Sequence, residues 1–382
     1  MACRYLTLLL CSAALASVSL PAQAVEPSDV VGNYAKLVYA NYSDAYQDAL
    51  ALQKAVDAFL ADPSEATLTK AKNAWLVSRD SYGQTEAFRF YEGPIDFVDE
   101  ANGMEGPEGR LNAWPLNEAY IDYVKGNESA GIVQDASVTI TKESLTEKNQ
   151  KTDEADVSTG YHAIEFLLWG QDLSLDSAGQ RPVSDYEKTE TNARRRAYLK
   201  AVADLLVDDL KFLVDSWTPG QDNYAATFVK DKASLTHIMT ALATLSGFEL
   251  ASERMATALD SGDQEDEHSC FSDNTHNDFI MNAKGISNVF FGTYGDLKGA
   301  SIYSLLKEND EKLAEALEQQ ITETTRLMDS IPHPIDREVL ATPKGSAARE
   351  KAELAVASLQ KQADLFKEAG KTLGLDVQIM SE

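Results

Sequence analysis

The chain has 382 residues, enough for two domains or one large one, and enough to bury a sizeable core. Its 61 Asp and Glu residues outnumber its 34 Lys and Arg residues, which gives a formal net charge of −27 at pH 7. Such a surface repels nucleic-acid phosphates and anionic lipid headgroups, so we expect no nucleic-acid partner and no peripheral membrane binding. A hydrophobic share of 44% excludes a disordered chain.

Residues 1–24 have the pattern of a secretory signal peptide. Arg4 is their single charge, residues 6–20 form a short apolar run, and residues 22–24 (Ala-Gln-Ala) suit a cleavage site. The run falls short of the roughly 20 residues that a membrane-spanning helix needs, so a cleaved signal is favoured over an anchor. We therefore expect a periplasmic protein with no transmembrane segment after cleavage, and outer-membrane association is a further option.

Apolar residues then recur at spacings of three and four, which is typical of amphipathic helices. The first such run covers residues 31–59. A cap at Asp62, with Pro63 as the first helical residue, predicts a second helix that ends near Phe90. Further helices are expected at about 191–217, 235–245, 308–330 and 346–369, and no segment shows convincing strand alternation.

This pattern predicts an all-α fold made of two helical-bundle halves. A signal at 1–24 is followed by an N-terminal half at 25–185 and a C-terminal half at 186–382. The boundary falls between the 171–190 loop and the Thr-Pro-Gly turn at 218–220. A Gly-to-Glu ending of a helix near residues 83–86 recurs near 247–249, which suggests an internal duplication.

The second predicted helix places Trp75, Arg79, Tyr82 and Glu86 on one stripe, at steps of four, three and four. That stripe should face inward, where a charged side chain is costly unless it is paired or binds a ligand. Two interpretations stay open: a structural Arg–Glu network, or ligands and orienting groups of a metal site.

The motif that most specifically suggests metal binding lies in residues 160–170 (Gly-Tyr-His-Ala-Ile-Glu-Phe-Leu-Leu-Trp-Gly). In a helix, His162 and Glu165 share one face, so an imidazole nitrogen and a carboxylate oxygen can bind one ion. The spacing alone is weak evidence, but an unpaired polar pair among apolar and aromatic residues would be expensive.

Residues 268–276 (His-Ser-Cys-Phe-Ser-Asp-Asn-Thr-His) gather side chains that suit either a metal or a helix cap. Cys270, Asp273 and His276 are therefore candidates for a second site. The alternative is a loop that starts a helix, with Cys270 as a small buried apolar residue. The sequence contains no G-x-S-x-G, phosphate-loop, G-x-G-x-x-G or H-E-x-x-H pattern.

Four blocks in order resemble the imelysin-like family, the group that also contains insulin-cleaving metallopeptidase and iron-regulated protein A. They are residues 75–96, 112–117, 160–165 with their G-x-H-x-x-E pattern, and 269–276, and the last is most similar to the iron-regulated protein A branch. The resemblance spans about 30–375 as a single region. It implies an exported, all-helical protein with a metal site around His162, Glu165 and Glu86.

The resemblance implies two functions that need different chemistry. The favoured one is iron binding for acquisition, with His162, Glu165, Glu86 and Asp96 as ligands, since iron suits oxygen-rich sites. The partners would be a metal ion, free or chelated, and membrane components of iron uptake.

In that interpretation Arg79, Tyr82 and Trp114 would orient ligands or bind an accompanying anion. The alternative is a zinc metallopeptidase in which Glu165 and Glu86 serve catalysis. Because Phe166 follows Glu165, the inverted H-x-x-E-H zinc motif is incomplete.

Overall fold

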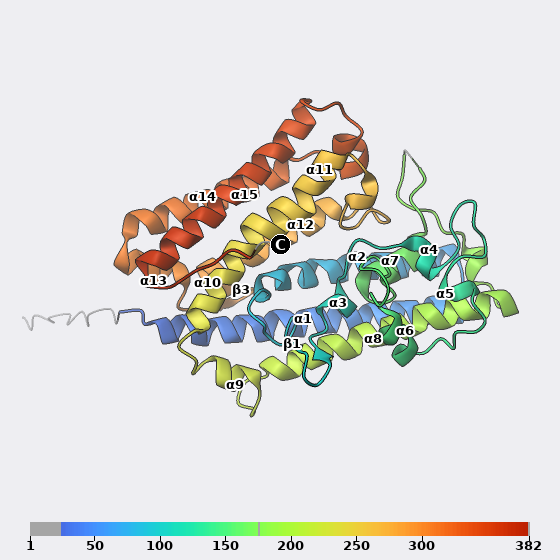
Figure 1. Cartoon of the computed structure of the whole chain (residues 1–382), viewed down its shortest axis with the longest axis horizontal. Helices are drawn as coiled ribbons and strands as arrows, with labels where there is room; N and C mark the ends of the chain where they lie inside the picture. Colours follow the sequence, from blue (N-terminus) through green and yellow to red (C-terminus); the bar gives the residue numbers. More distant parts are fainter. Residues whose placement is uncertain (1–23, 175, 381–382) are drawn as a thin grey trace, which may run out of the picture.

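The computed structural model describes residues 24–174 and 176–380, so residues 1–23 of the expected signal peptide lie outside the described residues. In that part of the chain helices dominate, and four two-residue strands pair as the antiparallel hairpins β1–β2 and β3–β4 (Figure 1). The fold is all-α, as predicted. The elements in chain order are α1 (Pro27–Ala61), α2 (Glu65–Gly83), η1 (Gln84–Phe88), β1 (Val98–Asp99), β2 (Met104–Glu105), α3 (Glu108–Leu111), α4 (Glu118–Ile121), α5 (Gly131–Gln134), α6 (Lys142–Lys148), α7 (Gly160–Trp169), η2 (Val183–Tyr186), α8 (Glu190–Trp217), α9 (Tyr224–Phe228), α10 (Ser234–Thr244), η3 (Leu245–Ala256), α11 (Thr257–Ser261), η4 (Gln264–Asp266), α12 (Thr275–Phe291), β3 (Thr293–Tyr294), β4 (Leu297–Lys298), α13 (Ile302–Asn309), α14 (Glu311–Ser330), η5 (Asp336–Leu340) and α15 (Ala347–Thr372).

Helix α1 confirms the apolar spacing that predicted it. All nine residues of its three- and four-step pattern, from Val31 to Phe59, are buried. Helix α2 begins later than predicted, because Ser64 is the N-cap and accepts a hydrogen bond from the Thr67 backbone N–H. Asp62 and Pro63 therefore lie outside the helix.

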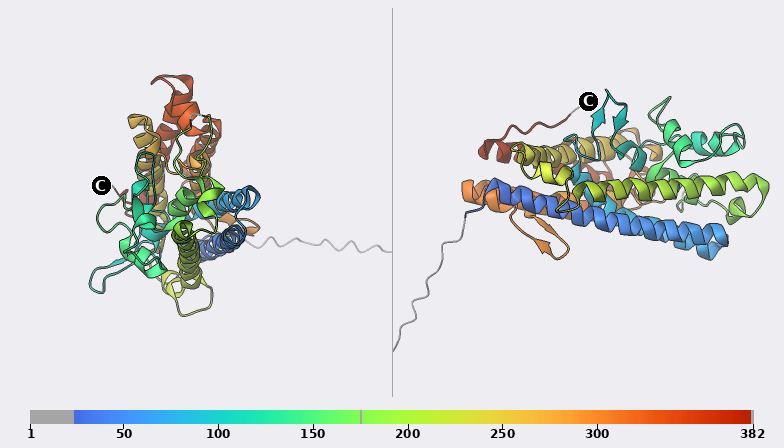
Figure 2. Two further views of the ribbon diagram at one scale, coloured as in Figure 1. Left: turned by 90° about the vertical axis from the view of Figure 1, so that its right-hand side faces the viewer. Right: turned by 90° about the horizontal axis from the view of Figure 1, so that it is seen from below.

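Helices α1, α2 and α8 lie side by side along the length of the molecule, and α7 is wedged against α2 and α8 (Figures 1 and 2). Tyr198 of α8 fixes the segment before α7 by donating a hydrogen bond of 2.8 Å to the Ser158 carbonyl oxygen. Helix α8 thus packs with the N-terminal helices although it starts at residue 190. We therefore propose a boundary at the late end of the expected range, near residues 218–220.

The second set of helices comprises α10, η3, α12, α14 and α15, drawn above the first set in Figure 1. Helix α12 joins the two sets, since it packs on α14 and also on α2 and η1. This packing needs a glycine at 285, because a Cβ atom there would lie 2.3 Å from the Gln84 carbonyl oxygen. The close approach brings polar residues of both sets together at the junction.

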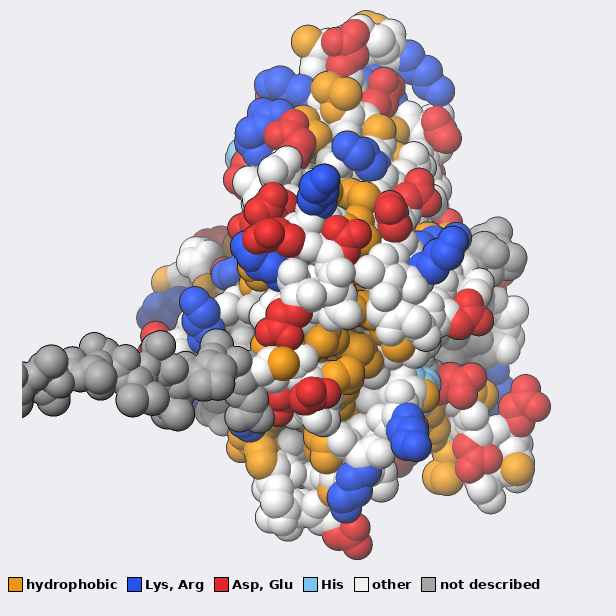
Figure 3. Space-filling view, turned by 90° about the vertical axis from the view of Figure 1, so that its left-hand side faces the viewer, with side chains coloured by type: hydrophobic (Ala, Val, Ile, Leu, Met, Phe, Trp, Pro, Cys, Tyr) orange, Lys and Arg blue, Asp and Glu red, His pale blue; other side chains and the backbone are white. Residues whose placement is uncertain are grey.

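Charged side chains of both signs are interspersed on the end of the molecule shown in Figure 3, so the net negative charge does not form one acidic patch on this face. In the part of the chain that the structure describes, none of the helices is both long and apolar enough to cross a membrane.

Candidate functional site

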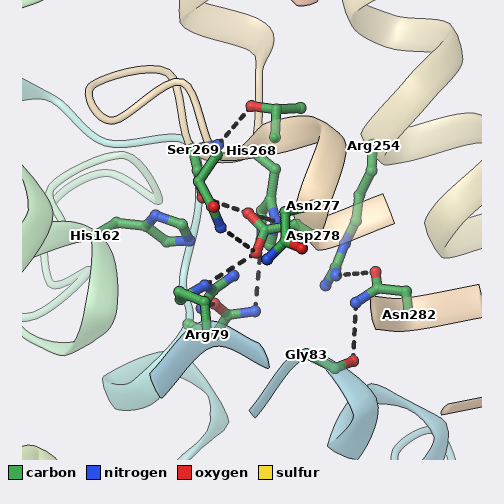
Figure 4. Close-up of polar contacts among 12 residues, drawn as sticks. Arg79, Gly83, His162, Arg254, His268, Ser269, Asn277, Asp278 and Asn282 are labelled. Atoms are coloured by element: carbon green, nitrogen blue, oxygen red, sulfur yellow. Dashed lines mark hydrogen bonds and ion pairs between the residues drawn. The ribbon is translucent and has the colours of Figure 1, made fainter. Parts of the chain in front are cut away.

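The candidate site lies at the junction of the two helix sets. Figure 4 shows side chains that converge from both sides: Arg79 from α2 and His162 from α7, opposite Arg254 from η3 and Asp278 from α12. His268 enters the same space from the segment that precedes α12. Segments up to about two hundred residues apart in the sequence are therefore assembled into one buried polar cluster.

His162 and Glu165 are joined within α7, as their i, i+3 spacing predicts. The distance from His162 Nδ1 to Glu165 Oε2 is 2.9 Å, and both residues are fully buried. The other oxygen of Glu165 accepts hydrogen bonds from the backbone N–H and the hydroxyl of Ser272, at 2.9 and 2.6 Å. His162 Nε2 is buried and has no hydrogen-bond partner among the described residues. The hydrogen bond to Glu165 thus holds Nδ1 of His162 in place, and Nε2 is left available to bind a ligand.

Burial shifts the protonation of this pair toward neutral forms. Desolvation, with the charges of neighbouring groups including Arg79, holds the pKa of His162 well below its ordinary value. Desolvation raises the pKa of Glu165 to about 8, against the opposing effect of the Ser272 hydrogen bonds. A neutral imidazole is the form that binds metal ions.

A second histidine lies beside the first. The ring centroids of His162 and His268 are 4.8 Å apart, at an interplanar angle of 63°. His268 Nδ1 is 3.4 Å from Asp278 Oδ2, and its Nε2 is 3.5 Å from the side-chain nitrogen of Asn112. Desolvation and the nearby Arg254 lower the pKa of His268 to about 4. Two neutral imidazoles, each next to an acidic side chain, therefore lie in edge-to-face contact.

Arg79 forms an ion pair with Asp278, the carboxylate beside His268. Its Nε donates to Asp278 Oδ1 at 3.1 Å, and its Nη1 donates to Asn112 Oδ1 at 2.7 Å. The guanidinium also lies over three aromatic rings, including that of Tyr82 at 5.5 Å and that of Tyr161 at 4.9 Å. Burial alone would raise the pKa of Asp278, but the adjacent Arg79 charge outweighs it and holds that pKa well below its ordinary value. Arg79 is committed to this ion pair.

Glu86 is held by cations. Its Oε2 accepts from Arg89 at 2.6 Å and from Arg254 at 2.8 Å, and its Oε1 accepts from Asn112 at 3.1 Å. Desolvation acts to raise the pKa of Glu86, but the two arginine charges lower it to about 2. A metal bound to Glu86 would have to displace one of these guanidinium groups.

The π-helix η3 supplies Arg254 and its second partner. In a π-helix residues five apart are neighbours, so Arg254 Nη2 reaches Glu249 Oε1 at 2.7 Å. An α-helix would turn these two side chains away from each other. Arg254 thus joins Glu249 and Glu86, the two glutamates that end the Gly-to-Glu patterns of the sequence. We call Arg79, Arg89 and Arg254, with Glu86, Glu249 and Asp278, the junction network.

A cavity of about 400 Å³ opens beside this network. Trp114 and His268 line it, together with Arg89, Arg254 and Glu108. The ring centroid of Trp114 is 5.2 Å from that of His162 and 6.5 Å from that of His268. Small ligands can therefore come close to the histidine pair from this side.

The remaining predicted residues lie elsewhere. Asp96 accepts a hydrogen bond from the Phe90 backbone N–H, and it makes no hydrogen bond with His162 in the part of the chain that the structure describes. Asp273 is ion-paired with Arg337.

His276 Nε2 is 2.9 Å from the Met328 carbonyl oxygen, and its ring stacks on His333 at 4.4 Å. Cys270 is buried, and desolvation raises the pKa of its thiol well above the ordinary value. The contacts of Cys270, Asp273 and His276 therefore do not join them in one group.

Sequence reasoning missed His268, Asp278 and Arg254 as parts of the site. His268 was visible only as a member of the 268–276 segment, and Asp278 stands ten residues further along. A usable signal for Arg254 was the Glu249–Arg254 pair, but its five-residue spacing matches no α-helical face.

Comparison with known proteins agrees with this architecture. A sequence profile described as Imelysin matches residues 38–365. Iron-regulated protein A of Synechococcus elongatus is 26% identical over 336 residues, which cover 85% of this chain and 81% of the relative. A crystal structure described as an iron-regulated protein A precursor from Parabacteroides distasonis has a TM-score of 0.68 at 20% identity, covering 90% of this chain and 94% of that one, and shows the same fold. Because the Imelysin profile covers most of the sequence, the chain belongs to the imelysin family.

Proposed function

We propose that this chain binds a first-row transition-metal ion between His162 and His268, and that iron is its cargo in an acquisition role. The observation that carries the proposal is the buried Nε2 of His162, which has no partner among the described residues and lies in a ring 4.8 Å from that of His268. Imidazole nitrogens suit iron as well as zinc, and both rings are held in the neutral form.

The carboxylates beside the histidines fit this role. Metal-binding histidines usually donate their other N–H to a carboxylate, which fixes the ring and strengthens the ligand. Glu165 stands in that position for His162, and Asp278 lies beside His268, 3.4 Å from a ring nitrogen that makes no hydrogen bond among the described residues. In this proposal Glu165 orients His162 or adds an oxygen ligand. Arg79 keeps Asp278 ionised, and Glu86 remains an ion-pair partner of the arginines.

Iron is proposed because the two relatives are named for iron regulation. The cavity next to His268 offers a path for the ion, free or chelated. Carboxylates outnumber cations around the site, because Glu86, Glu108, Glu249 and Asp278 surround three arginines. A dication is therefore compatible with the local charge. Export to the periplasm and contact with membrane uptake components remain parts of the proposal that depend on residues 1–24.

The test is calorimetric titration of the mature chain with ferrous iron under anaerobic conditions, with ferric citrate and with zinc. His162→Ala and His268→Ala should each lower the affinity at least tenfold, because each removes one nitrogen ligand. His333→Ala is the matched control, since His333 stacks on His276 away from the site. Unchanged affinity in both test variants would mean that the histidines belong to a structural network without metal.

A zinc metallopeptidase is the second candidate. One observation favours it: the raised pKa of Glu165, about 8, is suited to a general base at neutral pH. Against it, the two oxygens of Glu165 already bond to Ser272 and His162 in a fully buried position. Chelator-sensitive cleavage of an unfolded protein, lost in Glu165→Gln, would support this candidate and overturn a purely binding role.

A further inference from the structure

Three aspartates from distant segments meet away from the histidine pair. Asp172 follows α7, Asp273 precedes α12 and Asp336 begins η5. One carboxylate oxygen from each lies within 4.8 Å of the other two, and among the described residues this is the group of three or more ligand-type side chains that could hold a metal ion. We call these residues the aspartate cluster.

The hydrogen bonds of the cluster leave ligand oxygens free. Asp172 is 6% exposed; its Oδ1 accepts from the Ser174 backbone N–H at 3.2 Å, while its buried Oδ2 has no partner within the described chain. Asp336 Oδ1 is likewise buried without a partner there. A buried carboxylate oxygen without a donor loses its hydration and gains nothing in return, so these atoms point to a ligand that supplies positive charge.

One arginine does not neutralise the cluster. Arg337 is ion-paired with Asp273, and its Nη1 is 3.4 Å from Asp336 Oδ2. One positive charge therefore faces three negative ones. Glu267 is 1% exposed and its Oε1 has no partner among the described residues; burial raises its pKa, and the charges of all three aspartates raise it further. The excess negative charge calls for a cation of charge two.

We propose that Asp172, Asp273 and Asp336 bind a hard divalent cation, and that this cation is calcium. Calcium takes carboxylate, carbonyl and water oxygens at about 2.3–2.6 Å, so ligands on opposite sides of the ion are about 4.6–5.2 Å apart. Carboxylate oxygens that all lie within 4.8 Å of one another are close enough to share one such ion. Magnesium would draw opposite ligands to about 4.2 Å and prefers to keep its water, so it should bind more weakly.

The ion can reach the cluster from solvent. A surface cavity of about 550 Å³ is lined by Asp336 and Arg337, and also by Asp263 and Gln264. Gln264 donates to the Asp172 carbonyl oxygen at 2.7 Å, which fixes the Asp172 segment at the edge of this cavity. This site shares no residue with the histidine pair, so it goes beyond the proposed function and does not depend on it.

The experiment uses the mature chain, stripped with a chelator and dialysed, with calcium chloride or magnesium chloride as the probe. Calorimetric titration measures the affinity, and thermal unfolding measures the midpoint. At a calcium concentration about 100 times the Kd, the midpoint should rise by roughly 5 °C. No calcium effect on either measurement would overturn the proposal and leave Arg337 as the permanent counter-ion, and equal affinity for magnesium would overturn the choice of calcium.

Variants separate binding from folding. Asp172→Asn removes one charge from a crowded group, so the calcium-free protein should be at least as stable as the wild type, while the calcium-dependent rise disappears. Asp263→Asn, in the same cavity but outside the cluster, should keep the full rise. Arg337→Gln should raise the calcium affinity at least tenfold, because it removes a competing cation. A full rise in Asp172→Asn, or its equal loss in Asp263→Asn, would refute the assignment.

Discussion

Replacing the buried glutamate of the junction network tests its electrostatics directly. Glu86 is 1% exposed, and Glu86→Gln removes the carboxylate charge that forms ion pairs with both Arg89 and Arg254. The shift of its pKa from 4.5 to about 2 corresponds to about 3 kcal/mol of stability at pH 7. Breaking a buried ion pair by removing one partner costs about 3–5 kcal/mol, which agrees. We expect Glu86→Gln to lower the free energy of unfolding at pH 7 by about 3 kcal/mol.

The pH dependence gives the sharper test. The folded-state pKa lies below the ordinary value of 4.5, so the stabilisation is present above pH 4.5 and is lost as the pH falls toward 2. In urea titrations, the gap between wild type and Glu86→Gln should therefore be constant from pH 7 to about 5 and shrink below pH 4.5. A gap under about 1 kcal/mol at pH 7, or one that does not shrink in acid, would refute this reasoning.

The matched control uses the same spacing on the surface. Glu323 and Arg326 form an i, i+3 ion pair like that of Glu86 and Arg89, but both side chains of the control pair are exposed. Glu323→Gln should leave the unfolding curve unchanged, because water screens an exposed pair. An equal loss of unfolding free energy in Glu323→Gln and Glu86→Gln would show that burial does not cause the destabilisation.

Three further changes probe packing and support of the site. Gly285→Ala places a Cβ 2.3 Å from the Gln84 carbonyl oxygen, so calorimetry should show a midpoint lowered by several degrees, equivalent to about 2–4 kcal/mol. Gly32→Ala, in α1 with nothing within 4 Å of the added atom, should instead raise the stability by about 0.5–1 kcal/mol in urea unfolding. Ser272→Ala removes the 2.6 Å hydrogen bond to Glu165 and should lower the free energy of unfolding by about 1–3 kcal/mol in the same assay. Wild-type stability of Gly285→Ala or Ser272→Ala would contradict the contacts at those two positions, and a lower stability of Gly32→Ala would contradict the open space at Gly32.

The helices that could be predicted are those with one apolar face. Helix α1 buries every residue of its expected pattern. Helix α12 lacked such a signal, because at the junction its inward face carries the buried polar residues Asp278 and Asn282. The π-helix η3 could not be predicted either, since residues five apart are neighbours in it and this spacing follows no α-helical period. Hydrophobic periodicity thus finds helices that pack on a core and misses those that carry the polar junction.

The contacts of the candidate site likewise differ in whether the sequence predicts them. The contact between His162 and Glu165 lies within one helix, so its spacing in the sequence predicts it. The contact of Arg79 with Asp278 spans 199 residues, and local patterns contain no information on such a pair. The stripe that includes Arg79 and Glu86 indicated that both charges would be buried, but their partners came from the second helix set. Burial was predictable, whereas the identity of the partners depended on how the halves pack.

The two proposed sites offer different sets of donor atoms, and this difference bears on which cations each site can select. His162 and His268 lie among aromatic rings with imidazole nitrogens available, a donor set that favours transition metals over calcium. The aspartate cluster offers only carboxylate oxygens near the surface, where calcium competes well because its ligands need no fixed geometry. Calcium present in excess should therefore fill the cluster without displacing iron or zinc from the histidine pair.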